Sequence, residues 1–218
     1  MTKQMPTVEE FFDDLAQSAA YNRYLAYWYS MKPEDHRTFF LRFVFAFASV
    51  NTPWERNVMM FNALRHLDWQ NNPALLYMRL VESGAGMYRG RAKNMWSFCT
   101  DYWRDPDWYA KQPGEAWVEY RRRLVEAIPG LGRTKVSFTL EMSYPATEVV
   151  CLDRHMVRLY KKNHECSQKE YERFEAHWVR TAKHAGVLPG IARMLYWDQN
   201  QGYKDSRYWS EVLEASYV

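Results

Sequence analysis

Residues 124–138 read Leu-Val-Glu-Ala-Ile-Pro-Gly-Leu-Gly-Arg-Thr-Lys-Val-Ser-Phe and predict two helices joined by a tight turn. The first helix ends at Pro129, and Gly130 and Gly132 let the backbone turn sharply and come close to a partner. The second helix begins at once, so its N–H groups and positive dipole end suit a phosphate. The pattern predicts either a phosphate contact or a plain helix connector.

Helix signals run along the whole chain and predict an all-α fold. Capping pairs, which satisfy N–H groups at a helix start, stand at Thr7/Glu10, Thr52/Glu55 and Ser167/Glu170. Pro53 and Pro73 suit first helical positions. Helices are expected near 8–19, 21–30, 35–50, 53–67, 73–83, 90–103, 115–128, 133–143, 154–163, 168–185, 189–199 and 206–215. No segment alternates between apolar and polar residues for long enough to predict a strand.

Composition limits the class of protein. The 218 residues suit one domain, 1–218, and a net charge of +3 means that a nucleic-acid site must be local. No stretch is apolar enough for a membrane span or signal peptide, so we expect a cytoplasmic protein. The three cysteines form no CxxC pair and predict neither zinc nor an iron–sulfur cluster. The basic groups Arg89/Arg91/Lys93 and Arg121–Arg123 suit a solvated helix face or a phosphate contact.

A second informative segment is Cys151-Leu152-Asp153-Arg154-His155-Met156-Val157-Arg158. Asp153 precedes a helical pattern and suits a plain N-cap. The hairpin at 129–132 followed by this aspartate resembles the signature of the helix-hairpin-helix (HhH-GPD) DNA glycosylase superfamily, which includes endonuclease III and 8-oxoguanine glycosylase. Residues 48–52 and 86–94 resemble two further segments of that superfamily in the same order. The resemblance covers about 48–158, and the flanks, 1–47 and 159–218, match only as helices.

The resemblance implies an all-α glycosylase-like fold with two helical lobes flanking a DNA-binding cleft. It makes Asp153 catalytic and has the Asn51 amide fill the gap in the duplex, although an Asn before a cap is often turn chemistry. The remaining DNA contacts it implies are Gly130, Leu131, Gly132, Arg133, Thr134, Arg154 and Arg158. Trp54, Tyr88 and His155 would form the base pocket; Trp103 is a further stacking candidate, and packing is the alternative for these aromatic side chains.

Departures from the superfamily pattern narrow the chemistry. In members that also cleave the strand, a lysine lies two residues after the second hairpin glycine, where this chain has Thr134. Lys135 is one residue later, which turns it by about 100° on a helix. The resemblance therefore disfavours a glycosylase-lyase, and the four-cysteine iron–sulfur loop is absent. A monovalent cation at the hairpin is the one cofactor that the resemblance leaves open, with no other metal.

Residues 135–138 and 151–153 are most similar to a phage branch of the superfamily, which is assigned to thymine hypermodification. This similarity implies that an amine or amino acid displaces pyrophosphate from 5-(pyrophosphoryloxymethyl)uracil in DNA, with Asp153 and Lys135 as catalytic groups. The alternatives are a monofunctional N-glycosylase and a non-catalytic DNA-binding module. We expect double-stranded DNA as partner, no membrane, a monomer, and a bacterial or phage-infected cell as the setting.

Overall fold

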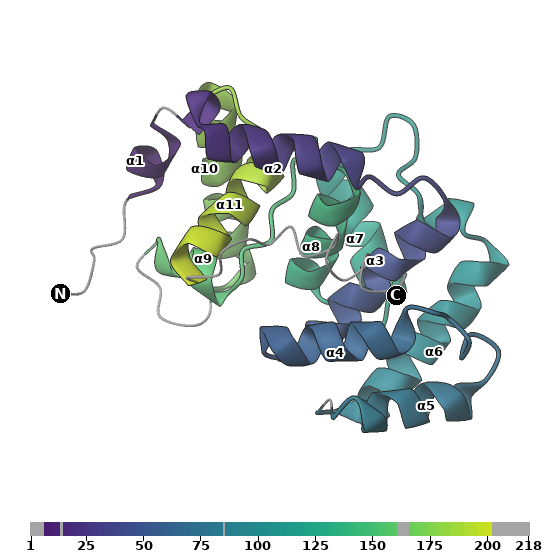
Figure 1. Ribbon diagram of the computed structural model, residues 1–218. Helices are drawn as coiled ribbons and strands as arrows, with labels where there is room; N and C mark the ends of the chain where they lie inside the picture. The colour runs from purple at the N-terminus through teal and green to yellow at the C-terminus, as the bar shows by residue number, and fades with distance from the viewer. Residues whose placement is uncertain (1–6, 14, 85, 161–165, 202–218) are drawn as a thin grey trace. The chain divides into compact units, whose positions relative to one another are not determined.

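The computed structural model describes residues 7–13, 15–84, 86–160 and 166–201, and every regular element within these ranges is a helix (Figure 1). The predicted all-α fold is confirmed, while the helix predicted at 206–215 lies outside the described residues. No helix in the described part of the chain has the length and apolar character needed to cross a membrane. The chain divides into two compact units, and the division falls within one helix, between Thr139 and Leu140.

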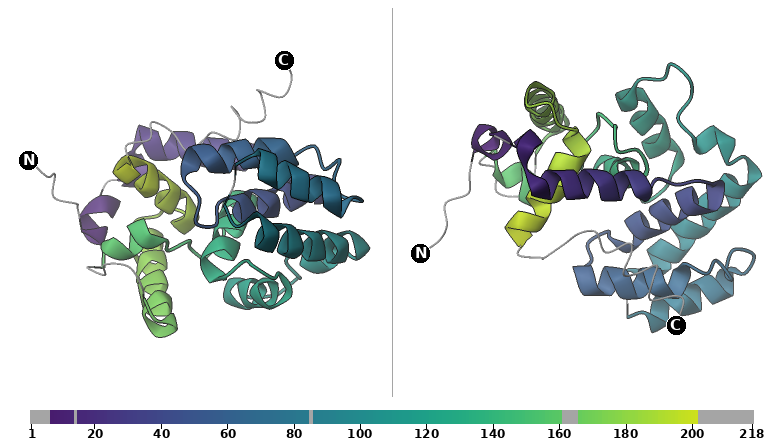
Figure 2. Two further views of the ribbon diagram at one scale, coloured as in Figure 1. Left: turned by 90° about the horizontal axis from the view of Figure 1, so that it is seen from below. Right: turned by 45° about the horizontal axis from the view of Figure 1, so that its top comes forward.

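The first unit comprises residues 33–139. Its helices are α3 (His36–Ala48), α4 (Trp54–Leu64), α5 (Pro73–Glu82), α6 (Tyr88–Arg104), α7 (Trp117–Ala127) and the first part of α8 (Arg133–Ser143). α3 is buried on nearly all sides and packs against α4 and α6, while α5 lies beside α4 and α6 (Figure 2). Phe40 and Phe98 stack at 5.3 Å between ring centroids, so aromatic packing forms this core.

The second unit comprises residues 1–32 and 140–218. Its described helices are α1 (Val8–Phe12), α2 (Ala19–Ser30), α9 (Arg154–Arg158), α10 (Gln168–His184), α11 (Pro189–Gln201) and the end of α8. α11 packs against α2, α9 and α10, and α1 packs on α10. The core is built around Trp178, whose indole N–H donates to Pro189 O at 3.0 Å. Tyr24 of α2 donates to the Asp198 carboxylate of α11, which joins two helices far apart in the sequence.

The observed N-caps agree with some of the predicted helix starts and differ from others. The capping boxes at Thr7 and Ser167 are confirmed, as is Pro73 at the start of α5, where Asn72 is the cap. The predicted cap at Thr52 is wrong, because its hydroxyl donates to Val50 O at 2.8 Å and Pro53 occupies the cap position.

The helix predicted over 8–19 is also wrong in extent. α1 ends at Phe12 and a 3₁₀ turn follows at Leu15–Gln17. Ser18 accepts from Tyr21 N and caps α2, so the chain leaves helical geometry before it.

Candidate functional site

The hairpin between α7 and α8 has the geometry that its glycines require. Leu131 N donates to Ile128 O at 3.3 Å across the turn, and Gly130 has φ +85°, a left-handed conformation that favours glycine. The Gly132 carbonyl then accepts from Lys135 N and Val136 N, both at 3.0 Å, which starts α8. Gly130 and Gly132 are exposed, whereas the Leu131 side chain is buried. The backbone at Gly130 and Gly132 is therefore available to a partner, whereas Leu131 is not.

Buried contacts from α6 and α7 support this hairpin. The Asn94 side chain lies against Gly130 so closely that a Cβ added there would be 2.3 Å from Asn94 Nδ2. Arg121 is 3% exposed and donates to Ser137 Oγ of α8 at 2.9 Å. The expectation of a solvated or DNA-contacting Arg121 is therefore wrong, because its guanidinium joins the two helices of the hairpin.

Arg91 of α6 anchors the second motif segment. Its guanidinium donates to Gly86 O at 2.9 Å, to Ala48 O at 3.1 Å and to Thr52 Oγ1 at 2.7 Å. It also donates to the carbonyls of Phe47 and Val50, which lie at the end of α3 and just beyond it. The side chain is buried, and burial lowers its pKa. Arg91 is thus neither a phosphate ligand nor part of a solvated face, but a clamp on the α3–α4 junction.

Two exposed residues stand at the edges of this clamp. Asn51 has φ +48° and Met87 has φ +59°, and both are exposed, Met87 at 62%. Non-glycine residues rarely adopt this left-handed conformation, and a strained backbone is often found at functional positions. Met87 was not predicted as a site residue, because the sequence shows only an unbranched apolar residue beside Gly86.

The remaining residues predicted for this unit differ in their surroundings. Trp54 packs against Phe45 at 5.7 Å between ring centroids, and Tyr88 contacts Tyr77 edge-on at 5.6 Å. Lys135 Nζ lies 5.8 Å from the centroid of the Phe138 ring. Arg133, Thr134 and Lys135 are all half-buried in the first turn of α8. The hairpin and the 47–52 junction are both braced by α6, through Asn94 and Arg91.

Asp153 belongs to the second unit and begins α9. Its Oδ1 accepts from His155 N at 2.9 Å and from Met156 N at 3.1 Å, so the predicted N-cap is present. The side chain is half-buried. Arg154 and Arg158 are exposed, while the half-buried His155 ring contacts Trp197 edge-on at 6.4 Å.

The segment that leads to Asp153 is held by three side chains from two helices, α8 and α10. Val150 N donates to Glu175 Oε1 at 2.8 Å, and Cys151 N donates to Glu141 Oε1 at 3.0 Å. The Tyr171 hydroxyl accepts from Leu152 N at 3.2 Å and donates to Val150 O at 2.6 Å. Three consecutive backbone N–H groups are therefore satisfied by the buried side chains Glu141, Tyr171 and Glu175.

Glu141 of α8 forms a two-contact ion pair with Arg193 of α11. Arg193 Nε donates to Glu141 Oε1 at 3.2 Å, and Arg193 Nη2 donates to Glu141 Oε2. Both residues are buried, at 1% and 3% exposure. Burial raises the pKa of Glu141 to about 7, although the Arg193 guanidinium opposes this shift.

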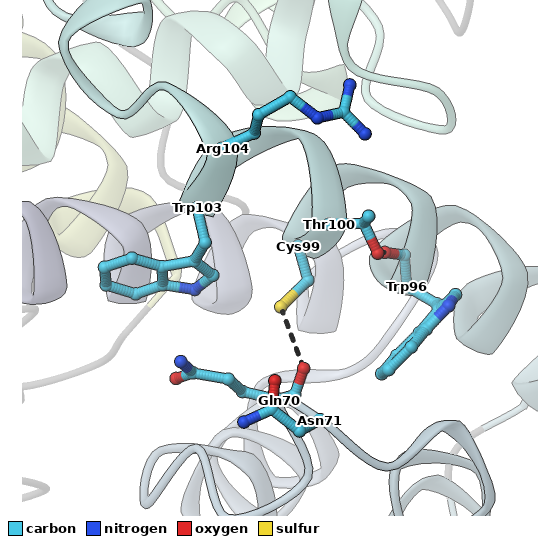
Figure 3. A pocket seen from close by; sticks show the side chains of 7 residues that line it. All are labelled: Gln70, Asn71, Trp96, Cys99, Thr100, Trp103 and Arg104. Atoms are coloured by element: carbon cyan, nitrogen blue, oxygen red, sulfur yellow. Dashed lines mark hydrogen bonds between the residues drawn. The ribbon is translucent and has the colours of Figure 1, made fainter.

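A pocket of about 430 Å³ lies elsewhere, in the first unit (Figure 3). Its lining residues are Gln70, Asn71, Trp96, Cys99, Thr100, Trp103 and Arg104. The two indoles lie on either side of Cys99, whose thiol points toward the Gln70 carbonyl at 3.9 Å. Burial raises the pKa of this thiol to about 12, so it stays protonated and is a poor nucleophile. Trp103 lines this pocket, which contains no hairpin residue.

Solved structures of 8-oxoguanine DNA glycosylases share this fold. The Methanocaldococcus jannaschii 8-oxoguanine glycosylase/lyase, in complex with DNA containing 8-oxoguanine, matches with a TM-score of 0.71 and 18% identity over 89% of this chain and 97% of that chain. The 8-oxoguanine DNA glycosylase of Thermotoga maritima matches with a TM-score of 0.71 and 18% identity over 91% and 100% of the two chains. No family model and no curated protein matches the sequence. The chain therefore has the helical helix-hairpin-helix DNA glycosylase fold, and its activity must be argued from its residues.

Proposed function

We propose that this chain is a DNA base-modifying enzyme that acts on an extruded base, with Asp153 as its catalytic carboxylate. The observation that carries the proposal is the fixation of the segment before Asp153. A plain helix cap needs only the His155 and Met156 N–H groups, yet three buried side chains also hold residues 150–152. Catalytic carboxylates require such fixed geometry, because a small misplacement costs much of the rate.

DNA is the partner that best fits the exposed hairpin. Gly132 carries no side chain and is exposed, so a phosphate oxygen can approach the backbone at the positive end of α8. In this proposal Gly130, Arg133 and Thr134 line the same contact, while the exposed Arg154 and Arg158 bind phosphates by charge. These contacts fix the duplex without reading its sequence.

Asn51 and Met87 have the properties expected of residues that enter a duplex. An apolar side chain can wedge between base steps, and an amide can replace the lost base by hydrogen bonding. Base extrusion is necessary because the reacting atoms are hidden inside a duplex. Arg91 holds both backbone segments, so the two side chains present a fixed rather than a yielding edge. Tyr88, Trp54 and His155 remain proposed contacts of the extruded base.

Two reactions fit one ionised carboxylate. In excision, water forms a bond to C1′ of the sugar and gives up a proton, while the base leaves with the bonding electrons and takes up a proton. Asp153 stabilises the positive charge that develops on the sugar. In transfer, an amine nitrogen bonds to the methylene carbon of 5-(pyrophosphoryloxymethyl)uracil, pyrophosphate leaves, and Asp153 takes the amine proton. Lys135 would then bind the departing pyrophosphate.

Separate observations favour each reaction. The neighbours of known structure are named as glycosylases, which favours excision. Thr134 at the position of the strand-cleaving lysine favours excision without cleavage. The similarity of residues 135–138 and 151–153 to the phage branch favours transfer with an amine or amino-acid co-substrate.

One experiment separates these reactions. The protein is incubated with duplexes that contain normal, oxidised or 5-(pyrophosphoryloxymethyl) bases, with and without a mixture of amines, and the nucleosides are weighed by mass spectrometry. Abasic sites establish excision, and a mass change at uracil without base loss establishes transfer. A duplex that is bound but unchanged in every case would refute both and leave a binding module.

Asp153→Asn tests the carboxylate itself. Asparagine is also a good N-cap, so α9 and DNA affinity should persist. Activity should fall by at least about 100-fold, because the negative charge is lost where positive charge develops. The measurement is single-turnover product formation together with the DNA dissociation constant. Wild-type turnover by this variant would reduce Asp153 to a helix cap.

A further inference from the structure

We infer that Glu141 and Arg193 are positioning residues for the Asp153 carboxylate, an inference that rests on the proposed function. The resemblance to the superfamily assigns no role to either residue. They act through the backbone, because Glu141 Oε1 accepts from Cys151 N two residues before Asp153. The bond fixes where the segment before Asp153 ends and therefore where α9 and its cap begin.

Glu141 is itself held from two sides. Arg193 contacts both of its carboxylate oxygens, which fixes the plane of the group. At the start of α11, a Cβ added to Gly190 would lie 3.2 Å from Glu141 Cγ, so a glycine makes room for this side chain. The helix that supplies Arg193 is thus shaped around Glu141.

Stability alone is a poor explanation of this pair. A buried ion pair can often be replaced by apolar side chains of similar size without loss of stability, because two charges must be removed from water. An apolar replacement would nevertheless leave Cys151 N–H without an acceptor. What the pair supplies is a hydrogen-bond acceptor at one fixed point beside the catalytic segment.

Two double variants test this role. Glu141→Gln with Arg193→Met removes both charges and keeps an acceptor for Cys151 N–H. Glu141→Leu with Arg193→Met removes both charges and the acceptor. Both variants avoid an unpaired buried charge, so both should fold. We expect the single-turnover rate of the Leu/Met variant to lie about 10- to 100-fold below that of the Gln/Met variant, with equal DNA dissociation constants.

Tyr24→Phe is the matched control. It removes a different buried hydrogen bond to α11, that to Asp198. It should lower stability and leave the rate unchanged. Equal rates for the Gln/Met and Leu/Met variants, or a Tyr24→Phe rate as low as that of the Leu/Met variant, would overturn the inference in favour of a purely structural pair.

Hydrogen exchange keeps the inference separate from the proposed function. The Cys151 amide should exchange at least about tenfold faster in the Leu/Met variant than in the Gln/Met variant, as followed by NMR in the full chain. Unchanged exchange would overturn the inference even if the enzyme is active. Faster exchange in a protein whose activity survives Asp153→Asn would instead show that Glu141 holds the segment and that the proposed catalytic role of Asp153 is wrong.

Discussion

Gly130 and Gly132 stand two positions apart in the sequence and have different tasks in the structure. Gly130 adopts φ +85° and lies against Asn94, so it is required by the turn itself. Gly132 has an ordinary φ, and a Cβ built on it meets nothing within 4 Å. Its lack of a side chain is therefore not explained by the fold, and a partner that approaches the backbone is the explanation we favour.

Valine at each position separates the two roles. Gly132→Val should change the free energy of unfolding by no more than about 1 kcal/mol, the cost of a poorer helix start. It should weaken DNA binding about tenfold by blocking one phosphate contact. Gly130→Val should cost at least about 2 kcal/mol through left-handed strain and displacement of Asn94. Urea unfolding and DNA titration measure both; undiminished affinity of a folded Gly132→Val protein would remove the hairpin from the interface.

At the scale of the element, α6 is the brace of the first unit. Arg91 and Asn94 lie one helical turn apart, and they hold the α3–α4 junction and the hairpin respectively. The two motif segments at 48–52 and 129–132 are thus both held by the third, residues 86–94, which lies at the start of α6. The spacing of three residues could be seen in the sequence, but the burial of a charged side chain could not.

Arg91→Leu tests the brace. The substitution leaves several buried carbonyls without a donor, so the free energy of unfolding should fall by about 2–4 kcal/mol. Lys93→Leu, at an exposed position of the same helix, should change it by less than about 0.5 kcal/mol. Chemical denaturation with urea gives both values. A loss no greater than that of Lys93→Leu would mean that water replaces the guanidinium at little cost.

Helix starts and the hairpin were predictable because their signals are local. Thr7, Asn72 and Ser167 each act on backbone within three residues, and all three caps are present. The prediction of a helix cap at Thr52 was wrong because the Arg91 guanidinium, 39 positions away, donates to its hydroxyl. Asp153 could be singled out through the motif around it, whereas Glu141 and Arg193 could not. Their contact joins side chains 52 positions apart, and no local pattern records it.

At the scale of the molecule, the buried Glu141 makes stability depend on pH. Burial, opposed by Arg193, raises its pKa from 4.5 to about 7, so the folded state binds this proton more tightly than the unfolded chain does. The stabilisation from protonated Glu141 is complete below about pH 4.5 and is lost as the pH rises through about 7. The charge of Asp153 also raises the pKa of Glu141.

We expect the free energy of unfolding to fall by about 2–3 kcal/mol between pH 5 and pH 8 on account of this group. The Glu141→Gln/Arg193→Met protein should lack this decline. Any dependence of its unfolding free energy on pH comes from the histidines and other groups, and serves as the reference. Urea denaturation at four pH values in this range supplies the comparison. Parallel profiles for the two proteins would show that Arg193 keeps Glu141 ionised throughout.

The path of the chain through its two units has a consequence for synthesis on the ribosome. Residues 33–139 form one continuous stretch and can collapse as they emerge from the exit tunnel. α2 precedes this stretch, but its partner α11 is the last described helix to appear. When Asp153 has just been synthesised, Tyr171, Glu175 and Arg193 have not yet been added to the chain. The carboxylate therefore acquires its setting only after Arg193 has been synthesised.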